Sequence, residues 1–181
     1  GLRAARHGAM MKYMLRAYAH RVEEPAEVMT LLNDAVSQTL GNDEFVTCFF
    51  GVLDPTARRF TYANAGHDEP LFIRANGGET LRLRTTGAAV GMLEDCQYSS
   101  ESVSLSPGDL LLFYTDGVTD ARGVDERMEI EGLEELVRMC PHDARSLIDC
   151  IVKEVMRRSG NRLADDVAIL ALEVLQDEPL E

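Results

Sequence analysis

Hydrophobic residues recur at helical spacing twice near the start of the chain. The first stretch lies within residues 2–17, and the second runs from Val28 to Thr39, shortly after Pro25 and just before Gly41. Proline near the start of such a segment and glycine after its end are typical helix boundaries. The pattern therefore predicts two N-terminal helices.

The last third of the chain repeats this helical spacing. A short stretch covers residues 133–140, and a clearer amphipathic stretch covers residues 144–155. Arg157 and Arg158 follow the clearer stretch, and Gly160 can cap its end. Two further helices are predicted here.

Between these stretches, β-branched and aromatic residues gather in short runs that typical turn residues separate. The runs cover residues 45–54, 58–66, 70–75, 81–84, 102–105, 110–114 and 165–174. Asp-Pro, Asn-Gly-Gly and Ser-Pro-Gly-Asp sequences join successive runs and favour hairpins. Because hairpins connect antiparallel strands, the sheets are predicted to be largely antiparallel.

Three of these runs are apolar at odd and even positions alike, namely residues 45–53, 110–114 and 167–172. Such strands need cover on both faces. A single sheet with helices on one face would leave half of these side chains in water. The pattern favours an α+β fold with four layers, in which two largely antiparallel sheets form a sandwich between helices.

Composition narrows the class of protein. The chain has 181 residues, of which 45% are hydrophobic, and this fits one globular domain. Its formal net charge of −13 disfavours nucleic acid and anionic membranes as partners. Residues 1–22 nevertheless hold five basic and no acidic side chains, which form a solvated helix face or, alternatively, a partner patch. No apolar run approaches the roughly 20 residues that span a bilayer.

The four cysteines have no metal-binding spacing. They are Cys48, Cys96, Cys140 and Cys150, and no two form a Cys-x-x-Cys pair. We expect no disulfide framework and no thiolate zinc site, but free thiols in a reducing compartment, hence a cytoplasmic protein. The chain opens with Gly1 and no Met, so we expect it to be cut from a longer protein.

Carboxylates stand at the ends of two predicted strands. Asp116 follows residues 110–114, and Asp165 and Asp166 precede residues 167–172. Carboxylates brought together would repel unless a cation lay between them, and Mg²⁺ or Mn²⁺ suits such sparse oxygen ligands. Taken singly, Asp-Gly and Asp-Asp are typical of turns, and His67 is typical of a hydrogen-bonded turn.

Three strings share their order with a known family. "FVTCFFGVLDPTARRFTYANAGHDEPLFIR", "LLLFYTDGVTDARG" and "LADDVAILALEV" resemble the bacterial SpoIIE/RsbU-type serine/threonine phosphatases of the protein phosphatase 2C class. The opening "GLRAARHGAMM" is similar to the start of that family's first helix. The resemblance covers residues 1–174 as one domain and leaves residues 175–181 as an acidic tail.

The resemblance implies a sandwich of two antiparallel sheets with two Mg²⁺ or Mn²⁺ ions at one end. Asp116 matches a metal ligand of the family, and so does Asp165, whereas Asp166 would be a neighbouring or alternative ligand. A metal-bound water would attack the phosphate, so no further catalytic residue and no phosphoenzyme are needed. The absence of a Cys-x5-Arg motif agrees with this mechanism.

The sequence departs from the family pattern in two places. An Asp-Gly and a Gly-Asp-Val that supply metal ligands lie upstream of the family's first helix, so the chain is expected to be truncated at its N-terminus. His67 stands where the wider class has an aspartate linked to a further metal ion. A third metal site is therefore not expected.

Two functions follow from the resemblance. The first is a phosphatase that removes phosphate from phosphoserine or phosphothreonine on a regulatory protein such as an anti-sigma-factor antagonist. Family members carry an upstream sensor or receiver domain, and we expect one here. The alternative is a catalytically inactive phosphatase-like module that binds a signalling partner.

Overall fold

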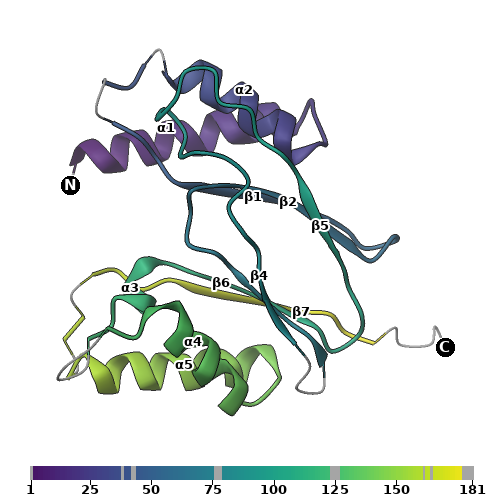
Figure 1. Ribbon diagram of the computed structural model, residues 1–181, viewed down its shortest axis with the longest axis vertical. Coiled ribbons are helices and arrows are strands. Elements are labelled where there is room, and N and C mark those ends of the chain that lie inside the picture. The colour runs from purple at the N-terminus through teal and green to yellow at the C-terminus, as the bar shows by residue number, and fades with distance from the viewer. Residues whose placement is uncertain are drawn as a thin grey trace. The chain divides into compact units, whose positions relative to one another are not determined.

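The computed structural model describes residues 2–37, 39–41, 44–75, 79–122, 127–160, 162–163 and 165–176, with side chains from residue 6 onward. The chain divides into two units (Figure 1). Unit 1 comprises Gly1–His67 and Arg84–Ser104, and unit 2 comprises Asp68–Leu83 and Leu105–Glu181. Each unit combines helices with one antiparallel sheet, which confirms the predicted α+β class with two antiparallel sheets.

Unit 1 contains two helices and a three-stranded sheet. The helices are α1 (Leu2–Ala19) and α2 (Pro25–Ser37). The strands, in spatial order, are β1 (Cys48–Asp54), β2 (Arg59–Ala65) and β5 (Glu101–Ser104). β1 and β2 pair antiparallel along their full length, and α2 contacts both strands while α1 packs on α2. The two predicted N-terminal helices and the first predicted hairpin are confirmed.

The core of unit 1 joins the helices to β2 and to the segment before β5. Its buried members are Met11, Met29, Leu32, Val36, Leu40, Ala63, Ala65, Val90, Cys96 and Tyr98. The other face of α1 carries Lys12 and Arg16, which are exposed. No helix among the described residues is both long and apolar enough to cross a membrane.

Unit 2 is built on a four-stranded antiparallel sheet. Its strands, in spatial order, are β4 (Thr80–Arg82), β3 (Leu71–Ile73), β6 (Leu110–Tyr114) and β7 (Ile169–Glu173). Its helices are α3 (Asp116–Thr119), α4 (Glu129–Met139) and α5 (Ala144–Arg158). The two helices predicted for the last third are confirmed, with Gly160 in a left-handed conformation after α5. The short helix α3 was not predicted, because Asp116-Gly117 reads as a turn.

Burial on both faces, predicted for three strands, holds for β6, holds in part for β1 and fails for β7. In β6, Leu110, Leu111 and Leu112 are all buried. In β7, which is an edge strand, Leu170 and Leu172 are 54% and 39% exposed. The prediction is wrong for β7, because only its other face packs against the core of unit 2. In β1, all residues but one are half-buried.

The prediction that all four cysteines are free is also wrong. Cys140 and Cys150 form a disulfide with a Cα–Cα distance of 6.0 Å, whereas Cys48 and Cys96 are free. Cys140 caps the end of α4, and Cys150 lies on α5. The short connection between these helices brings α5 back against α4, an approach that the ten-residue spacing does not reveal.

Candidate metal centre

β6 leads into α3 through a single residue. Thr115 has φ −97° and ψ 161°, an extended conformation, and stands at the N-cap of α3. The carbonyl oxygen of Asp116 accepts from the backbone N–H of Asp120 at 2.7 Å and from the hydroxyl of Thr119 at 3.2 Å. The backbone of Asp116 is thus fixed at the end of a buried strand, while its side chain is exposed.

The second acidic segment forms a tight turn before β7. The backbone N–H of Asp166 donates to the carboxylate of Asp165 at 2.7 Å, and both residues are exposed. This turn explains why β7 begins at Ile169, two residues after the start of the predicted strand at residues 167–172. Asp165 therefore has one role that the structure shows, which is to fix its own turn.

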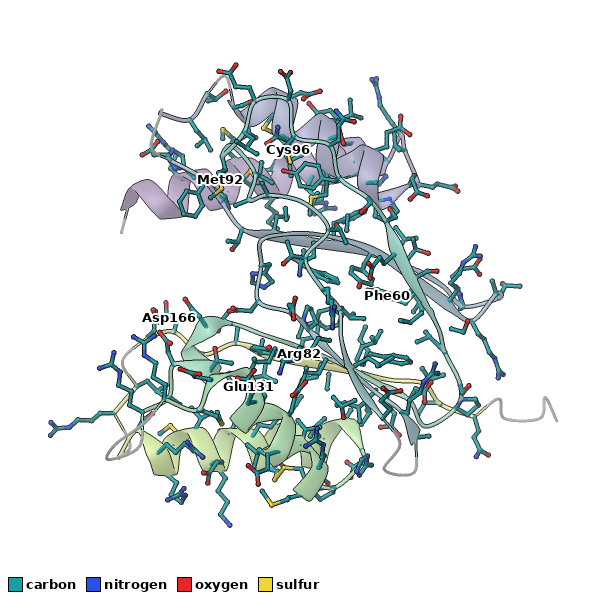
Figure 2. The ribbon with its side chains drawn as sticks, in the orientation of Figure 1. Phe60, Arg82, Met92, Cys96, Glu131 and Asp166 are labelled. Carbon is teal, nitrogen blue, oxygen red and sulfur yellow. A yellow bond between two sulfur atoms is a disulfide. The ribbon has the colours of Figure 1, made fainter. Side chains whose placement is uncertain are left out.

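The pairing of β6 with β7 brings the two acidic segments together. Tyr114 is opposite Ile169 in the antiparallel register, so the residues after Tyr114 lie beside those before Ile169. A Cβ atom at Gly117 would lie 2.5 Å from the carbonyl oxygen of Asp166. Figure 2 shows Asp166 beside α3. Segments about 50 residues apart in sequence thus meet at one end of the sheet.

The side chains at this end could hold a hard cation. Among the described residues, the carboxylates of Asp116 and Asp166 have no hydrogen-bond or ion-pair partner. Unpaired oxygen ligands on adjoining rigid segments fit Mg²⁺ or Mn²⁺. However, no group of three or more His, Cys, Asp or Glu side chains within the described ranges could hold a metal ion. The structure thus brings together the segments of the three predicted ligands without forming a complete site.

The neighbouring arginine on this side already has a partner. The guanidinium of Arg127 donates to the carboxylate of Asp120 at 3.0 Å. Arg127 therefore compensates Asp120, one turn after Asp116, and within the described ranges no hydrogen bond or ion pair joins it to Asp116. The negative charge of Asp116 at the start of α3 is therefore not compensated by Arg127.

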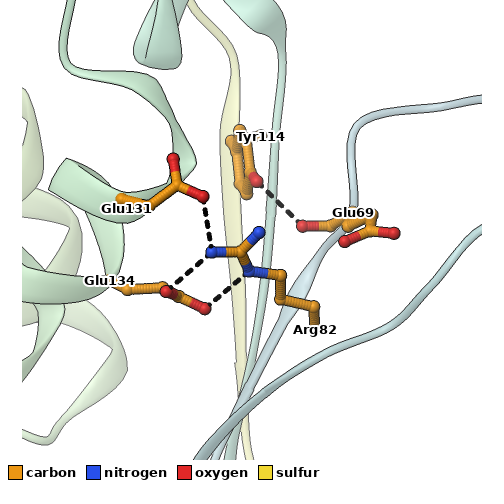
Figure 3. A network of polar contacts seen from close by, with 5 residues as sticks. All are labelled: Glu69, Arg82, Tyr114, Glu131 and Glu134. Carbon is orange, nitrogen blue, oxygen red and sulfur yellow. Dashed lines mark hydrogen bonds and ion pairs between the residues drawn. The ribbon is translucent and has the colours of Figure 1, made fainter.

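A polar network supports β6 and α4 behind this end of the sheet (Figure 3). Arg82 donates to both carboxylate oxygens of Glu134 at 2.8 and 2.9 Å, and to Glu131 at 3.0 Å. The hydroxyl of Tyr114 donates to the carbonyl of Glu69 at 2.8 Å. Burial, together with nearby carboxylates, raises the pKa of Tyr114. This network was not predicted, and its only signal in the sequence is the alternation of arginine in "LRLR".

His67 belongs to a hydrogen-bonded turn in unit 1, as its sequence context suggested. The side-chain amide of Asn64 donates to the carbonyl of His67 at 3.1 Å and accepts from its backbone N–H at 2.8 Å. Asn64 is fully buried, and Gly66 between the two residues has a φ of +67°. A left-handed conformation of this kind favours glycine. The turn accounts for most of the "NAGH" string.

Sequence comparisons connect the chain to bacterial regulatory proteins. The family model described as Stage II sporulation protein E (SpoIIE) matches residues 1–175. Protein IcfG of Synechocystis sp. is 35% identical over 147 residues, which are 78% of this chain and 23% of IcfG. The phosphoserine phosphatase RsbU of Bacillus subtilis is 26% identical over 174 residues, or 95% of this chain. The chain spans 52% of the length of RsbU.

Solved structures share the fold. The RsbU and RsbW domains of a Mycobacterium tuberculosis protein superpose with a TM-score of 0.81 at 26% identity, over 99% of this chain and 50% of theirs. The PP2C phosphatase domain of Bacillus subtilis SpoIIE, with a fragment of its regulatory domain, gives 0.82 at 17% identity, over 99% and 51%. The catalytic domain of the phosphatase PstP, in complex with two manganese ions, gives 0.63 at 14%, over 93% and 82%. The fold of this chain is that of PP2C phosphatases.

Proposed function

Because this chain belongs to the SpoIIE family of phosphatase 2C-like proteins, we propose that it catalyses metal-dependent hydrolysis of phosphoserine or phosphothreonine in a protein. The observation that carries the proposal is the meeting of two acidic segments at one end of the second sheet. Asp116 follows β6, Asp165 and Asp166 precede β7, and the pairing of these strands brings the segments together. Carboxylates that come close together repel each other, and a bound cation would relieve that repulsion.

In this proposal, Asp116 and Asp165 hold the ions, and Asp166 is a neighbouring or alternative ligand. Two Mg²⁺ or Mn²⁺ ions would supply an activated water and stabilise the charge on the phosphoryl oxygens. The rigid ends of β6 and β7 would fix the ligand geometry. The protein would need no side-chain nucleophile.

The free cysteines support hydrolysis by water over a thiol nucleophile. Cys96 is buried, and burial raises the pKa of Cys48 to about 11. A thiol with such a pKa is almost fully protonated at neutral pH, and the thiolate is the nucleophilic form. Neither group is suited to attack a phosphate.

We propose an anti-sigma-factor antagonist, or a similar phosphorylated regulatory protein, as the substrate. The similarity to RsbU, which is named a phosphoserine phosphatase, supports this class. The match of the family model to residues 1–175 supports one phosphatase domain over residues 1–174 and a tail over residues 175–181. An upstream sensor or receiver domain stays a prediction.

A cytoplasmic location also stays a prediction. It rested in part on free thiols, and the Cys140–Cys150 disulfide removes half of that argument, because disulfides are rare in cytosolic proteins. Detection of the reduced or oxidised form of this pair in cell extracts by alkylation and mass spectrometry would inform the location.

The alternative function is a phosphatase-like module that binds a partner without catalysis. One observation favours it, since the described residues contain no group of three side chains that could hold a metal ion. Retention of both acidic segments in contact favours the enzyme, because a binding scaffold gains nothing from their mutual repulsion. The two functions predict different effects of Mn²⁺: an enzyme would turn over substrate only with Mn²⁺, and a binding module would show no turnover with or without it.

Turnover of p-nitrophenyl phosphate by the full-length protein, with and without Mn²⁺, tests the proposal. We expect Mn²⁺-dependent turnover that Asp165→Asn abolishes and Asp166→Asn reduces by about tenfold, because an amide is a weaker ligand than a carboxylate. Asp149→Asn is the matched control, since Asp149 is exposed on α5 and its carboxylate has no hydrogen-bond or ion-pair partner in the described part of the chain. Turnover without Mn²⁺, or normal turnover by Asp165→Asn, would contradict the proposal.

A further inference from the structure

We propose that Thr115 is a positioning residue of the candidate metal centre, because its hydroxyl group joins the Asp116 segment to the Asp165–Asp166 turn. The inference rests on the proposed function. Thr115 itself supplies no ligand. Its role is to fix the distance and direction between carboxylates on two strands.

Thr115 makes three hydrogen bonds to the same short segment. Its hydroxyl donates to the carbonyl of Asp166 at 3.0 Å and accepts from the backbone N–H of Ala168 at 3.0 Å. Its own backbone N–H donates to the carbonyl of Ala168 at 3.1 Å. A hydroxyl has a single donor proton, and here both the donor and an acceptor position are directed at residues 166–168.

These bonds extend the contact between β6 and β7 past the last paired residues. Tyr114 and Ile169 form the end of the ladder. Asp166 and Ala168 lie beyond that end, before the first residue of β7. If the hydroxyl were removed, Thr115 would keep one of its three hydrogen bonds to this segment. That bond runs from its backbone N–H to the carbonyl of Ala168.

Gly117 provides a second, independent sign of the same close approach. A Cβ atom there would lie 2.5 Å from the carbonyl oxygen of Asp166 and 3.1 Å from a methyl group of Val167. Since the clash would be with backbone, the turn itself would have to shift. The start of α3 is therefore shaped to admit the Asp166 carbonyl that the Thr115 hydroxyl binds.

This contact matters for metal binding because it fixes the backbone that carries the carboxylates. Asp116 and Asp166 have no side-chain partner among the described residues, so their positions depend on the backbone. Metal–ligand distances tolerate deviations of only about 0.2 Å. A polar group that orients ligands typically changes metal affinity by 10–100-fold when it is removed.

The test replaces Thr115 by valine, which keeps the branched shape and removes the hydroxyl, and by serine, which keeps the hydroxyl. Mn²⁺ affinity of the full-length protein is measured by calorimetry, and hydrogen exchange of the Ala168 amide is measured without metal. We expect Thr115→Val to weaken Mn²⁺ binding by about tenfold or more. We expect Thr115→Ser to stay within about threefold of the wild type. The Ala168 amide should exchange faster in the valine variant alone.

Asp116→Asn, measured in parallel, separates failure of this inference from failure of the proposed function. Wild-type Mn²⁺ affinity in Asp116→Asn, or no binding by the wild type, would overturn both. Lost affinity in Asp116→Asn with unchanged affinity in Thr115→Val would overturn the positioning role alone. So would a Thr115→Val protein that is unfolded without metal at the assay temperature, because the role would then be structural.

Discussion

Strand β6 has one aspartate just before its first residue and another two residues after its last, and their surroundings are opposite. Asp109 is 1% exposed, and its carboxylate accepts from Arg74 at 3.1 Å and from the backbone N–H groups of Ala75 and Ser106 at 2.8 Å each. Asp116 is exposed, and its carboxylate has no partner among the described residues.

This contrast shows which of two similar carboxylates is available to bind a metal ion. Asp109 is satisfied by one cation and two backbone donors, so it holds a turn together. Exposed carboxylates without partners are common on protein surfaces and carry no function by themselves. Asp116 differs from them because the backbone of Asp166 lies against the start of α3. The structural and the functional carboxylate are thus distinguished by their neighbours.

The largest expected effect is on catalysis at the end of β6 that leads into α3. Asp116→Asn should lower Mn²⁺-dependent turnover of p-nitrophenyl phosphate by about 1,000-fold, which corresponds to about 4 kcal/mol of transition-state stabilisation. Its free energy of unfolding without metal should be equal to or above that of the wild type, since the substitution removes a like charge beside Asp166. Steady-state kinetics and urea unfolding give the two quantities. Normal turnover by Asp116→Asn, or a free energy of unfolding below that of the wild type, would contradict the functional role of Asp116.

Replacement of Asp109, at the other end of β6, should lower stability and leave catalysis unchanged. Asp109→Ala leaves two backbone N–H groups and Arg74 without this acceptor, and we expect it to lower the free energy of unfolding by about 3 kcal/mol. Turnover per folded molecule should stay close to that of the wild type. Urea unfolding followed by circular dichroism measures the loss, with Asp149→Ala as the exposed control. Equal unfolding free energies for the two variants would contradict a structural role for Asp109.

A smaller effect is expected for a carboxylate that is partnered but only partly buried. Glu134 accepts from Arg82 at 2.8 Å, and this bond lowers its pKa below the ordinary value of 4.5. A lowered pKa in the folded state contributes stability above the ordinary pKa, and this contribution is lost as the pH falls below about 4.5.

Glu134→Gln should therefore destabilise the protein by less than about 1 kcal/mol at pH 7 and have a smaller effect at pH 3.5. Thermal unfolding at both pH values measures the difference, and Glu135→Gln, at an exposed position on α4, is the control. An equal loss of stability at both pH values would show that the charge of Glu134 contributes nothing. Glu134 would then belong with the unpartnered surface carboxylates.

Several parts of the fold were predictable because they depend on neighbours in sequence. Apolar spacing located α1, α2 and α5, and turn residues located the hairpin of β1 and β2. The start of β7 was misplaced by two residues, because Asp165 and Thr115 bind backbone groups that a strand would use. The Cys140–Cys150 bond was missed because it depends on the return of α5 against α4.

The acidic residues of the candidate site were predictable from the sequence, but the contacts that position them were not. Asp116 and Asp165 were named from their strings and their places at strand ends, and their roles as ligands stay predictions. Thr115 and Gly117 were not singled out, although both lie in the "YTDG" string. A threonine before a helix reads as an ordinary N-cap, and here it makes no side-chain bond to its own helix.

Sequence information was sufficient for the α+β class, the order of the main elements, the acidic composition and the strings that place the chain in its family. These follow from local propensity, periodicity and residue identity, which every short segment carries alone. The tertiary structure decided that Asp109 is structural, that Asp116 has no side-chain partner among the described residues, and that the Thr115 hydroxyl binds the turn that bears Asp166. Each of these depends on contacts between residues far apart in the chain, which exist only when the strands of unit 2 pair.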